Sequence, residues 1–351
     1  MFWSLLKSFF FLFNPERAHY LSMNLFSVAL KIPILSYFLK KSFAHRNNHL
    51  EKTVDGIVYK NPIGLAAGFD KDGKWLHLLS SLGFGFIEVG TVTPKPQVGN
   101  NKPRLFRLIK DLGIINRMGF NNEGVDALIS RLKKFNTNKK VIIGGNIGKN
   151  KNTSNAEAIN DYLFCFEKLF HYVDYFVINV SSPNTPNLRN LQDKEPLFEL
   201  LSQIQLLNKS YPFPKPIYLK IAPDLNNQAL SEIIDVVVKT KINGIVATNT
   251  TIQRPSDLKE INILGEQGGL SGLPVQKLSN KILIELNKNK HFTIISVGGV
   301  VSVSDVIFKF NHGADLVQIY SGLIYEGPWF IKKILNSLSK LSSKELNEKG
   351  S

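Results

Sequence analysis

From about residue 61 to residue 320 the chain repeats one unit: a short apolar run rich in β-forming residues, then a stretch with helical period. This alternation is the pattern of a parallel sheet whose strands are connected by helices. Eight such runs occur, which favours a closed (β/α)8 TIM barrel of the α/β class over an open, doubly wound sheet. The expected strands are residues 63–67, 86–90, 141–146, 175–180, 217–221, 244–247, 293–297 and 316–319.

The stretches between the runs predict the helices of the barrel. A length of 351 residues would allow two domains, but barrels of this size fold as one unit. Hydrophobic residues make up 43% of the chain and charged residues 20%, as in a globular protein with a sizeable core. We therefore expect one barrel over residues 51–342 and a disordered tail over residues 343–351. The expected helices are residues 157–170, 196–208, 227–239, 274–287 and 303–311.

Residues 1–50 form an N-terminal extension that is rich in Phe and Leu, with basic residues interspersed. No apolar run in it approaches the ~20 residues that span a bilayer. Asn14-Pro15 and Pro33 are typical of helix starts. The segment therefore predicts a pair or trio of short amphipathic helices that lie in a membrane interface. The alternative is a helical lid packed on the barrel, and both hold if a lipid-soluble ligand enters between the helices.

The formal net charge of +15 indicates an anionic partner: nucleic acid, anionic lipid or an anionic small molecule. Lysines are scattered, and the chain has no Arg-rich run, RNA-binding signature or zinc-finger spacing, so we expect no nucleic-acid partner. A membrane surface fits the basic, apolar extension better. The single cysteine, Cys165, excludes disulfides within the chain and a thiolate metal cage, and its helical surroundings predict a core position.

Polar side chains follow several of the expected strands. Asn179, Ser182 and Asn184 come at and just after the run 175–180, and they offer donors and acceptors without fixed charge, which suits a flat ring rich in amide groups. Ser182 could also move a proton. An ordinary turn is the alternative for this cluster. Because a barrel has its active site at the carboxyl ends of its strands, similar groups after the other strands should converge with it.

The last two strands are followed by Gly298-Gly299 and by Tyr320-Ser321-Gly322, where barrels commonly hold a phosphate on backbone N–H groups. Tight turns are the alternative. No pair of histidines stands with a carboxylate at a strand end, so no metal site is expected. Nor does a Gly-x-Gly-x-x-Gly motif follow a strand. These groups together predict a phosphate-bearing cofactor with a polar ring system.

The chain resembles dihydroorotate dehydrogenase, the flavin enzyme of pyrimidine synthesis, and in particular its membrane-associated, quinone-using class 2. The likeness runs from about residue 14 to residue 335. The matching strings are residues 61–71 (NPIGLAAGFDK), 90–94 (GTVTP), 102–107 (KPRLFR), 115–122 (INRMGFNN), 146–150 (NIGKN), 179–185 (NVSSPNT), 220–224 (KIAPD), 247–251 (ATNTT), 268–272 (GGLSG) and 317–322 (VQIYSG).

The resemblance implies one FMN per chain and an active site for dihydroorotate and its product orotate. In this likeness Lys71 pairs with the substrate carboxylate and asparagines match the amide groups of the ring. The implied FMN-binding residues are Ala67, Gly68, Lys71, Thr91, Asn146, Asn179, Lys220, Thr248, Gly272, Gly299, Tyr320 and Ser321. The implied substrate-binding residues are Lys71, Asn116, Arg117, Met118, Gly119, Phe120, Asn179, Asn184, Asn249 and Thr250.

The resemblance also implies catalytic roles. Ser182 stands at the family's base position, where class 1 enzymes carry cysteine, and would take a proton from C5 of dihydroorotate while C6 passes hydride to flavin N5. Since a free serine is a poor base, the proton must be relayed, and the implied relay is Thr185 with a water, with Phe120 shielding the path. Lys220 would stabilise negative charge on the reduced flavin.

A quinone, ubiquinone or menaquinone, is the implied electron acceptor. In class 2 enzymes the N-terminal helices form the mouth of an apolar tunnel to the flavin, and residues 16–19 match this motif. His19, Arg107 and Tyr320 are the implied polar contacts to the quinone head, although His19 could instead be a packing residue. The implied location is the cytoplasmic side of a bacterial inner membrane, with the mitochondrial inner membrane as the alternative.

Two other functions remain open from the sequence. A tRNA dihydrouridine synthase would also be a basic flavin barrel, but a cysteine is expected there in place of Ser182. A membrane-bound scaffold that retains a barrel without catalysis would be colourless when purified. One departure from the resembled family is Ser296, where glycine is frequent, and it should not alter phosphate binding through the backbone.

Overall fold

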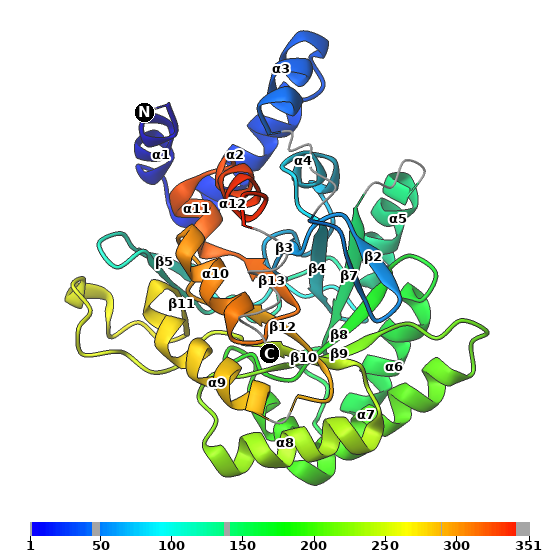
Figure 1. Cartoon of the computed structure of the whole chain (residues 1–351). Helices are drawn as coiled ribbons and strands as arrows, with labels where there is room; N and C mark the ends of the chain where they lie inside the picture. Colours follow the sequence, from blue (N-terminus) through cyan, green and yellow to red (C-terminus); the bar gives the residue numbers. More distant parts are fainter. Residues whose placement is uncertain (1, 44–49, 137–140, 289, 342–351) are drawn as a thin grey trace.

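The computed structural model describes residues 2–43, 50–136, 141–288 and 290–341. Its centre is a closed barrel of parallel strands in the order β10-β12-β13-β3-β4-β7-β8-β9 (Figure 1). These are the strands expected from the sequence, so the prediction of a TIM barrel is confirmed. They are β3 (Ile63–Leu65), β4 (Phe86–Val92), β7 (Ile142–Ile147), β8 (Tyr175–Asn179), β9 (Ile217–Ile221), β10 (Gly244–Ala247), β12 (Thr293–Val297) and β13 (Leu316–Ile319).

Helices surround the barrel, and those expected from the sequence begin and end within two residues of their predicted bounds. The helix expected at residue 274 begins at Gln276, because Leu273–Val275 forms a short 3-10 turn, η4, around Pro274. Cys165 is fully buried on α6, as predicted. The helices are α4 (Leu76–Ser81), α5 (Val125–Asn136), α6 (Ala158–Leu169), α7 (Lys194–Lys209), α8 (Asn227–Thr240), α9 (Gln276–Lys288), α10 (Val303–Asn311), α11 (Ser321–Glu326) and α12 (Phe330–Leu338).

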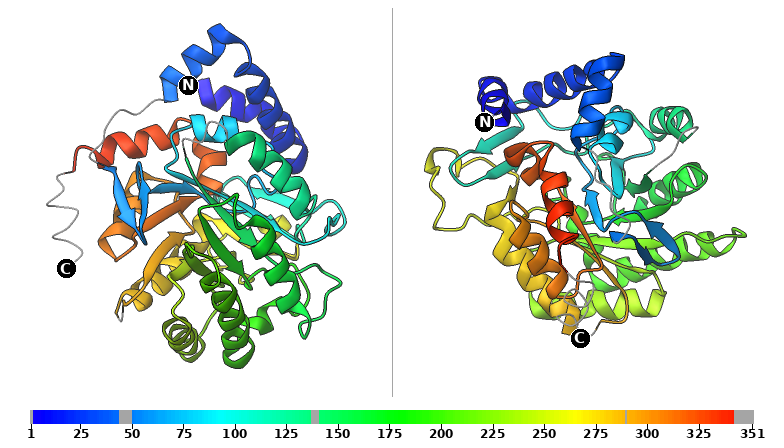
Figure 2. Two further views of the ribbon diagram at one scale, coloured as in Figure 1. Left: turned by 90° about the vertical axis from the view of Figure 1, so that its right-hand side faces the viewer. Right: turned by 45° about the horizontal axis from the view of Figure 1, so that its top comes forward.

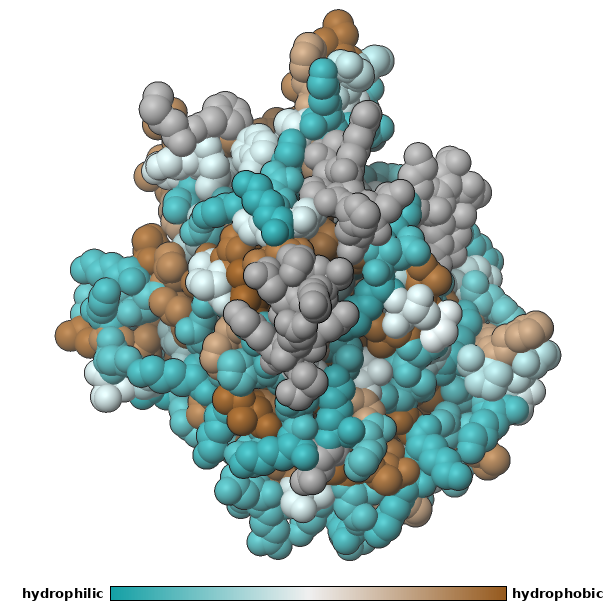
Figure 3. Space-filling view, viewed as in Figure 1, coloured by the Kyte–Doolittle hydropathy of each residue, from teal (hydrophilic) through white to brown (hydrophobic). Residues whose placement is uncertain are grey.

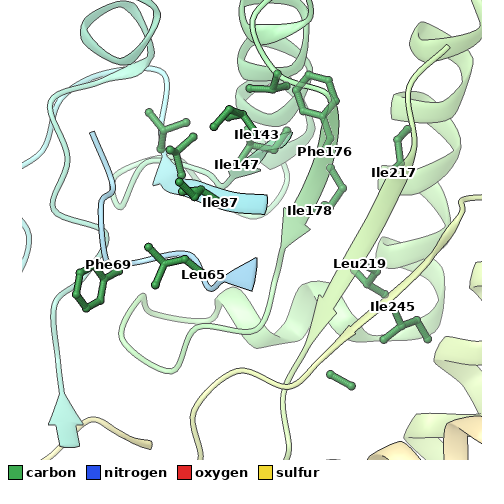
Figure 4. Packing of buried hydrophobic residues seen from close by; sticks show 14 of the residues in the cluster. Leu65, Phe69, Ile87, Ile143, Ile147, Phe176, Ile178, Ile217, Leu219 and Ile245 are labelled. Carbon is green, nitrogen blue, oxygen red and sulfur yellow. The ribbon is translucent and has the colours of Figure 1, made fainter. Parts of the chain in front are cut away.

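Alternation along each strand decides which side chains enter the barrel. In β4, Ile87 and Val89 belong to the large hydrophobic cluster that packs under the helices, whereas Phe86 belongs to the cluster inside the barrel. Figure 4 shows the outward-facing layer, in which Leu65, Ile87 and neighbouring residues of successive strands pack together. Residues at inward positions near the carboxyl ends of the strands therefore face the top of the barrel interior.

The opposite end of the barrel is closed by a hairpin of β1 (Lys52–Val54) and β2 (Ile57–Tyr59). Tyr59 of this hairpin is fully buried with Tyr175 and Tyr218 inside the barrel. The Tyr218 hydroxyl donates to Asp55 Oδ2 at 2.7 Å. Aromatic side chains thus fill the lower interior, and a ligand site has room only at the upper end.

A small antiparallel sheet of three strands, which the sequence did not predict, lies beside the barrel. It has the order β11-β6-β5, with β5 (Leu105–Leu108), β6 (Gly113–Asn116) and β11 (Gly269–Gly272). Gly269 pairs with Asn116, so a segment that follows the sixth barrel strand meets one that follows the second. This pairing brings the loop after Asn116 toward the loop around Thr250.

The N-terminal extension forms three helices, α1 (Phe2–Phe11), α2 (Pro15–Ala29) and α3 (Pro33–Phe43), which project from one side of the barrel (Figure 2). Asn14 caps α2 by accepting the Glu16 backbone N–H at 3.1 Å, and Pro15 occupies the first turn. The trio of short helices is therefore present as predicted. A division into separate domains near residue 50 stays a prediction, and the tail over residues 343–351 lies outside the described residues.

The first two of these helices are attached to the barrel by polar contacts. Glu16 and Arg104, both buried, form an ion pair at 2.7 Å, with a second bond from Arg104 Nε at 3.1 Å. Trp75 Nε1 donates to Asn24 Oδ1 at 2.9 Å, and Trp3 Nε1 of α1 donates to the Tyr325 carbonyl at 3.1 Å. The helices thus pack on the barrel while leaving other faces to solvent.

Those outward faces are apolar to an unusual degree for a water-exposed surface. In Figure 3 hydrophobic residues gather at the outer end of α3, at the top of the view. None of the described helices is long and apolar enough to span a membrane alone, while α2 and α3 taken together have the length and composition of a span, with a bend of 111° between them. The exposed large hydrophobic residues of the extension are Leu5, Phe9, Leu12, Phe13, Tyr20, Leu21, Leu25, Val28, Ile32, Ile34, Leu35, Tyr37 and Phe38.

Candidate active site

Two cavities adjoin at the upper end of the barrel. The first, here called the barrel cavity, has a volume of about 130 Å³ and lies over the carboxyl ends of the strands. The second, the helix cavity, has a volume of about 160 Å³ and lies between the barrel and helices α1 and α2. They share one wall, so a group seated at that wall would face both. The shared residues are Gly68, Lys71, Ile114, Met118 and Tyr320.

Most residues that the sequence placed at the site line the barrel cavity. Asn146 and Thr185 are buried and do not line it, and Asn146 is hydrogen-bonded to Thr91 of the lining. Arg117 points elsewhere, because its guanidinium pairs with Glu266 and packs over the Phe106 ring at 4.6 Å. The lining residues among those predicted are Ala67, Gly68, Lys71, Thr91, Asn116, Met118, Gly119, Phe120, Asn179, Ser182, Asn184, Lys220, Thr248, Asn249, Thr250, Gly272, Gly299, Tyr320 and Ser321.

The floor of the barrel cavity is a connected set of hydrogen bonds. Thr91 Oγ1 donates to Asn146 Oδ1 at 2.5 Å and accepts from Asn179 Nδ2 at 2.7 Å. Asn249 Nδ2 in turn donates to Ser181 Oγ at 3.0 Å. Because each amide is held on at least one side by a defined partner, the remaining polar atoms are oriented before any ligand binds.

A second pair of amides comes from the loops above the floor. Asn184 Nδ2 donates to Asn116 Oδ1 at 3.0 Å, which ties the loop after β8 to the end of β6. Asn100 Nδ2 donates to the Arg117 and Asn184 carbonyls at 3.0 and 3.3 Å and so supports the same contact. The small sheet therefore brings together two asparagines that are far apart in the sequence.

Ser182 is buried and lines the barrel cavity, and its Oγ accepts the Asn184 backbone N–H at 3.3 Å. The Thr185 hydroxyl is also buried, and among the described residues it has no hydrogen-bond partner. A buried hydroxyl of this kind usually binds an ordered water. Phe120 lines the cavity too, and its ring lies 3.0 Å from where a Cβ on Gly148 would be, so residue 148 must stay small.

Glu88 and Gln318, which sequence reasoning missed, complete the floor from below. Glu88 is fully buried, and its Oε1 accepts from Asn146 Nδ2 at 2.7 Å and lies 3.5 Å from Lys220 Nζ. Its Oε2 accepts from Gln318 Nε2 at 2.5 Å. The sequence does contain a signal for Glu88: this carboxylate lies two residues after Phe86, on the inward face of an apolar strand.

We expect Glu88→Ala to lower the free energy of unfolding by about 3–5 kcal/mol, because it leaves a buried ammonium and two amides without their anion. Chemical denaturation of the purified protein measures the change. The control is Glu285→Ala, which breaks a surface pair with Lys288 and should leave the denaturation midpoint nearly unchanged. Equal midpoints for the two variants would show that Glu88 does not hold the floor together.

The turns after β12 and β13 are suited to a phosphate group. Gly299 has a φ of 74°, and a Cβ there would lie 2.3 Å from the Gln276 Cβ, so only glycine fits. Gly272, with a φ of 84°, is similarly confined by the Leu112 carbonyl at 2.1 Å. Ser321 Oγ lies 3.0 Å from Ser271 Oγ at the same rim. Backbone turns of this kind can present N–H groups to an anion.

Serine 296 lies apart from this cradle. Its neighbours Ile295 and Val297 belong to the cluster inside the barrel, so the Ser296 side chain points outward to the helices, where it accepts a hydrogen bond from Lys309 Nζ at 3.1 Å. Serine in place of glycine at this position therefore affects the packing between β12 and the surrounding helices. Whether it leaves phosphate binding unaltered stays a prediction.

Lys71 supplies a cation between the two cavities. Its Nζ donates to Asn121 Oδ1 at 2.6 Å. Burial, with a further contribution from the charge of Arg104, lowers the pKa of Lys71 to about 8. The ammonium form therefore predominates at neutral pH, and no carboxylate among the described residues pairs with it, which leaves it free to bind an anionic ligand.

The helix cavity is lined mainly by apolar side chains from α1, α2 and α4, and the polar groups on its wall include His19, Arg107 and Tyr320. Burial lowers the pKa of His19 to about 4, so its imidazole is neutral, and its ring meets those of Phe69 and Trp75 edge to face at 4.8 and 5.1 Å. Arg107 lies over the Phe11 ring at 4.3 Å, and its Nη1 is buried without a partner within the described part of the chain. Tyr320 forms the shared wall, with its hydroxyl 3.4 Å from the Gly68 carbonyl.

Comparisons with a family model, with related sequences and with solved structures all point to the same protein family. The family model for dihydroorotate dehydrogenase matches residues 49–341. A dihydroorotate dehydrogenase (quinone) of Christiangramia forsetii is 56% identical over 336 residues, which cover 95% of this chain and 97% of that protein. One of Aeromonas salmonicida is 45% identical over 344 residues, with 96% and 100% covered. A structure of the Eimeria tenella enzyme with ferulenol superimposes with a TM-score of 0.82 at 35% identity, covering 92% of this chain and 90% of that chain.

Proposed function

The chain belongs to the dihydroorotate dehydrogenase family, and we propose that its two adjoining cavities serve the two halves of the reaction. That reaction is the oxidation of (S)-dihydroorotate to orotate with a quinone as electron acceptor, in pyrimidine biosynthesis. The barrel cavity takes the cofactor and the pyrimidine, and the helix cavity takes the quinone. The observation that carries this division is the wall that both cavities share, formed by Gly68, Lys71, Ile114, Met118 and Tyr320.

FMN is the cofactor that we assign to the barrel cavity. When bound, it would supply a two-electron acceptor between dihydroorotate and the quinone. The fit rests on three features of the site: backbone turns at Gly272 and Gly299 that only glycine can form, a floor rich in side-chain amides, and the cation Lys220 beside those amides. The residues that would hold FMN are Ala67, Gly68, Lys71, Thr91, Asn179, Lys220, Thr248, Gly272, Gly299, Tyr320 and Ser321, which line the cavity, and Asn146, which supports Thr91 from beneath.

Dihydroorotate would lie over the amide floor. Lys71 pairs with its carboxylate, and Asn179 and Asn249 present donors and acceptors to its ring amides. Asn116 and Asn184, already joined by a hydrogen bond, close the site from above. Arg117 contributes through its backbone loop alone, since its side chain is committed to Glu266. The other contacts proposed for the substrate are Met118, Gly119, Phe120 and Thr250.

Ser182 is the proposed base. Its hydroxyl takes the C5 proton of dihydroorotate and passes it toward the buried Thr185 hydroxyl through a water, for which that unpartnered group is a binding site. Phe120 keeps the path away from bulk solvent. Lys220 holds positive charge on the floor, where negative charge develops as electrons arrive, and the carboxylate of Glu88 keeps this ammonium in place.

The helix cavity is the proposed quinone site, for ubiquinone or menaquinone. Its apolar lining suits a quinone ring with an isoprenoid tail, and the Nη1 of Arg107, which has no partner among the described residues, can donate to a quinone carbonyl oxygen. His19, whose neutral imidazole carries a single N–H, is the second proposed polar contact. Tyr320 separates this site from the barrel cavity.

We place the protein at the cytoplasmic side of a bacterial inner membrane as a peripheral protein, with the mitochondrial inner membrane as the alternative. The exposed apolar faces of α1 to α3 and the basic residues Lys31, Lys40 and Lys41 support this.

A direct test of the cofactor is the absorbance spectrum of the purified protein. We expect a yellow protein that releases one FMN per chain on heating, and whose flavin is bleached by dihydroorotate in the absence of oxygen. A colourless protein that folds normally would rule out the proposal. Tight, steeply salt-dependent binding of tRNA, together with flavin that dihydroorotate does not reduce, would favour a dihydrouridine synthase instead.

We expect orotate binding to weaken above about pH 8, by about tenfold for each further pH unit, because the pKa of Lys71 is lowered to about 8 by burial. Below this pH the ammonium pairs with the orotate carboxylate, and above it the neutral amine cannot. Titration of the flavin spectrum with orotate between about pH 6.5 and pH 9 gives the dissociation constants. Lys71→Arg keeps its charge over this range and should flatten the profile. An unchanged profile in Lys71→Arg would assign the titration to another group.

A further inference from the structure

One fully buried ammonium is used by none of the steps above. Lys309 lies on α10, and its side chain is completely shielded from solvent. Its Nζ donates to three neutral oxygens: Ser279 Oγ at 3.2 Å, Asn280 Oδ1 at 3.1 Å and Ser296 Oγ at 3.1 Å. Within the described ranges no carboxylate forms an ion pair with it. A buried charge without an ion-pair partner is costly and calls for an explanation.

The negative charge of Asp305 acts on Lys309, although the two side chains form no ion pair within the described residues. Asp305 lies one turn before Lys309 on the same helix, but its Oδ2 accepts the backbone N–H groups of Val301 and Ser302 at 3.0 and 2.7 Å. Its Oδ1 accepts from Gln276 Nε2 at 2.8 Å. Asp305 therefore caps α10. Although burial lowers the pKa of Lys309, it does so only to about 8, so the group is charged at neutral pH.

The position of this charge relative to the glycine turn after β12 suggests its role. Ser279, which accepts from Lys309 Nζ, donates to the Val297 carbonyl at 2.8 Å, and Val297 directly precedes Gly298. A Cβ on Gly298 would lie 3.0 Å from both Cβ and Oγ of Ser279. One serine side chain therefore separates the ammonium from the Gly298-Gly299 turn.

We propose that Lys309 is a hidden positioning charge for the phosphate monoester of the cofactor, acting from behind the Gly298-Gly299 turn without touching the phosphate. This inference rests on the proposed FMN site. In a low-dielectric interior a charge acts over several ångströms, so a buried ammonium behind the turn attracts a dianion in front of it. The ammonium also orients Ser279, which holds the strand end under the turn.

The test compares FMN with riboflavin, which lacks the phosphate. Holoenzyme is diluted and the released flavin is measured by its fluorescence, and the same is done after exchange of FMN for riboflavin. In Lys309→Met we expect the dissociation constant of FMN to rise roughly tenfold, about 1.4 kcal/mol, while that of riboflavin changes by less than about twofold. The control is Lys277→Met, which removes a lysine that is 91% exposed on α9 and should change neither constant.

Equal weakening of FMN and riboflavin, or no change in either, would overturn the proposal, since a merely structural lysine affects both flavins alike. If Lys309→Met fails to fold, the dissociation constants of FMN and riboflavin are measured in Lys309→Gln instead. The Gln side chain can still hydrogen-bond Ser296. A measurement on the unaltered protein is independent of both variants. Because a buried charge is weakly screened, its preference for FMN should persist between about 0.05 M and about 1 M salt, and collapse of the preference would contradict the inference.

If the unaltered protein holds no flavin, or binds riboflavin as tightly as FMN, the proposed cofactor site fails. If it prefers FMN and Lys309→Met keeps that preference, only the role of Lys309 fails.

Discussion

Replacing Ser182 by alanine will slow the reduction of the bound flavin by dihydroorotate by about 10²- to 10⁴-fold, the usual contribution of a positioned proton acceptor. Ser182 lines the barrel cavity, and only one hydroxyl is lost, so the amide floor and the flavin should be retained. The variant should therefore be as yellow as the unaltered protein. Anaerobic stopped-flow mixing with dihydroorotate, followed at the flavin absorbance maximum, measures the rate.

The matched variant is Ser182→Cys, which restores a group that can accept a proton. Since a thiol ionises near pH 8.5, we expect its rate of flavin reduction to recover in part and to rise with pH toward that value. Unchanged single-turnover rates in Ser182→Ala would remove Ser182 from the mechanism. The proton would then have to leave by another route, and the unpartnered Thr185 hydroxyl would have no part in it.

Deleting residues 1–45 will abolish quinone turnover while leaving reduction of the flavin by dihydroorotate within about threefold of its original rate. The deletion removes α1, α2 and α3, and with them one side of the helix cavity. The residues that line the barrel cavity begin at Ala66 and remain. Membrane binding should be lost with the exposed apolar helices. Turnover is measured with a quinone and, for comparison, with a water-soluble dye that needs no helix cavity.

A point variant makes the same test without removing helices. Ala18 of α2 is buried and lines the helix cavity, so Ala18→Phe should fill part of its volume and slow quinone turnover. Arg17→Phe is the control, because Arg17 is exposed on the same turn and does not line the cavity. Quinone turnover that survives both the deletion and Ala18→Phe would show that the helix cavity is not the quinone site.

The barrel was predictable because its strands are buried on both faces, which makes them short, nearly continuous apolar runs such as Tyr175–Asn179. The small sheet was not, because it pairs Asn116 with Gly269, and neither strand carries a recognisable pattern alone. A long separation in sequence also explains why the orientation of the Arg117 side chain could not be predicted. Its loop position could be predicted by resemblance, but the partner that turns its side chain away, Glu266, lies 149 residues along the chain.

Glu88 and Lys309 illustrate what a search of strand ends overlooks. Both are charged residues inside regular elements, at positions that alternation or helical period assigns to the interior. Their roles depend on neighbours from other elements, Lys220 and Asn146 for Glu88, and Ser279 for Lys309. A charge at an interior position is the sequence signal, and only the structure supplies the partner.

We expect one flavin at the shared wall to receive electrons from one cavity and to deliver them to the other. Mixing the protein with dihydroorotate without oxygen, and then adding ubiquinone, tests it in two stages. We expect the flavin absorbance to be bleached in the first stage and to return in the second. Bleaching without recovery would contradict the quinone site, and no bleaching would contradict the assignment of the barrel cavity to dihydroorotate.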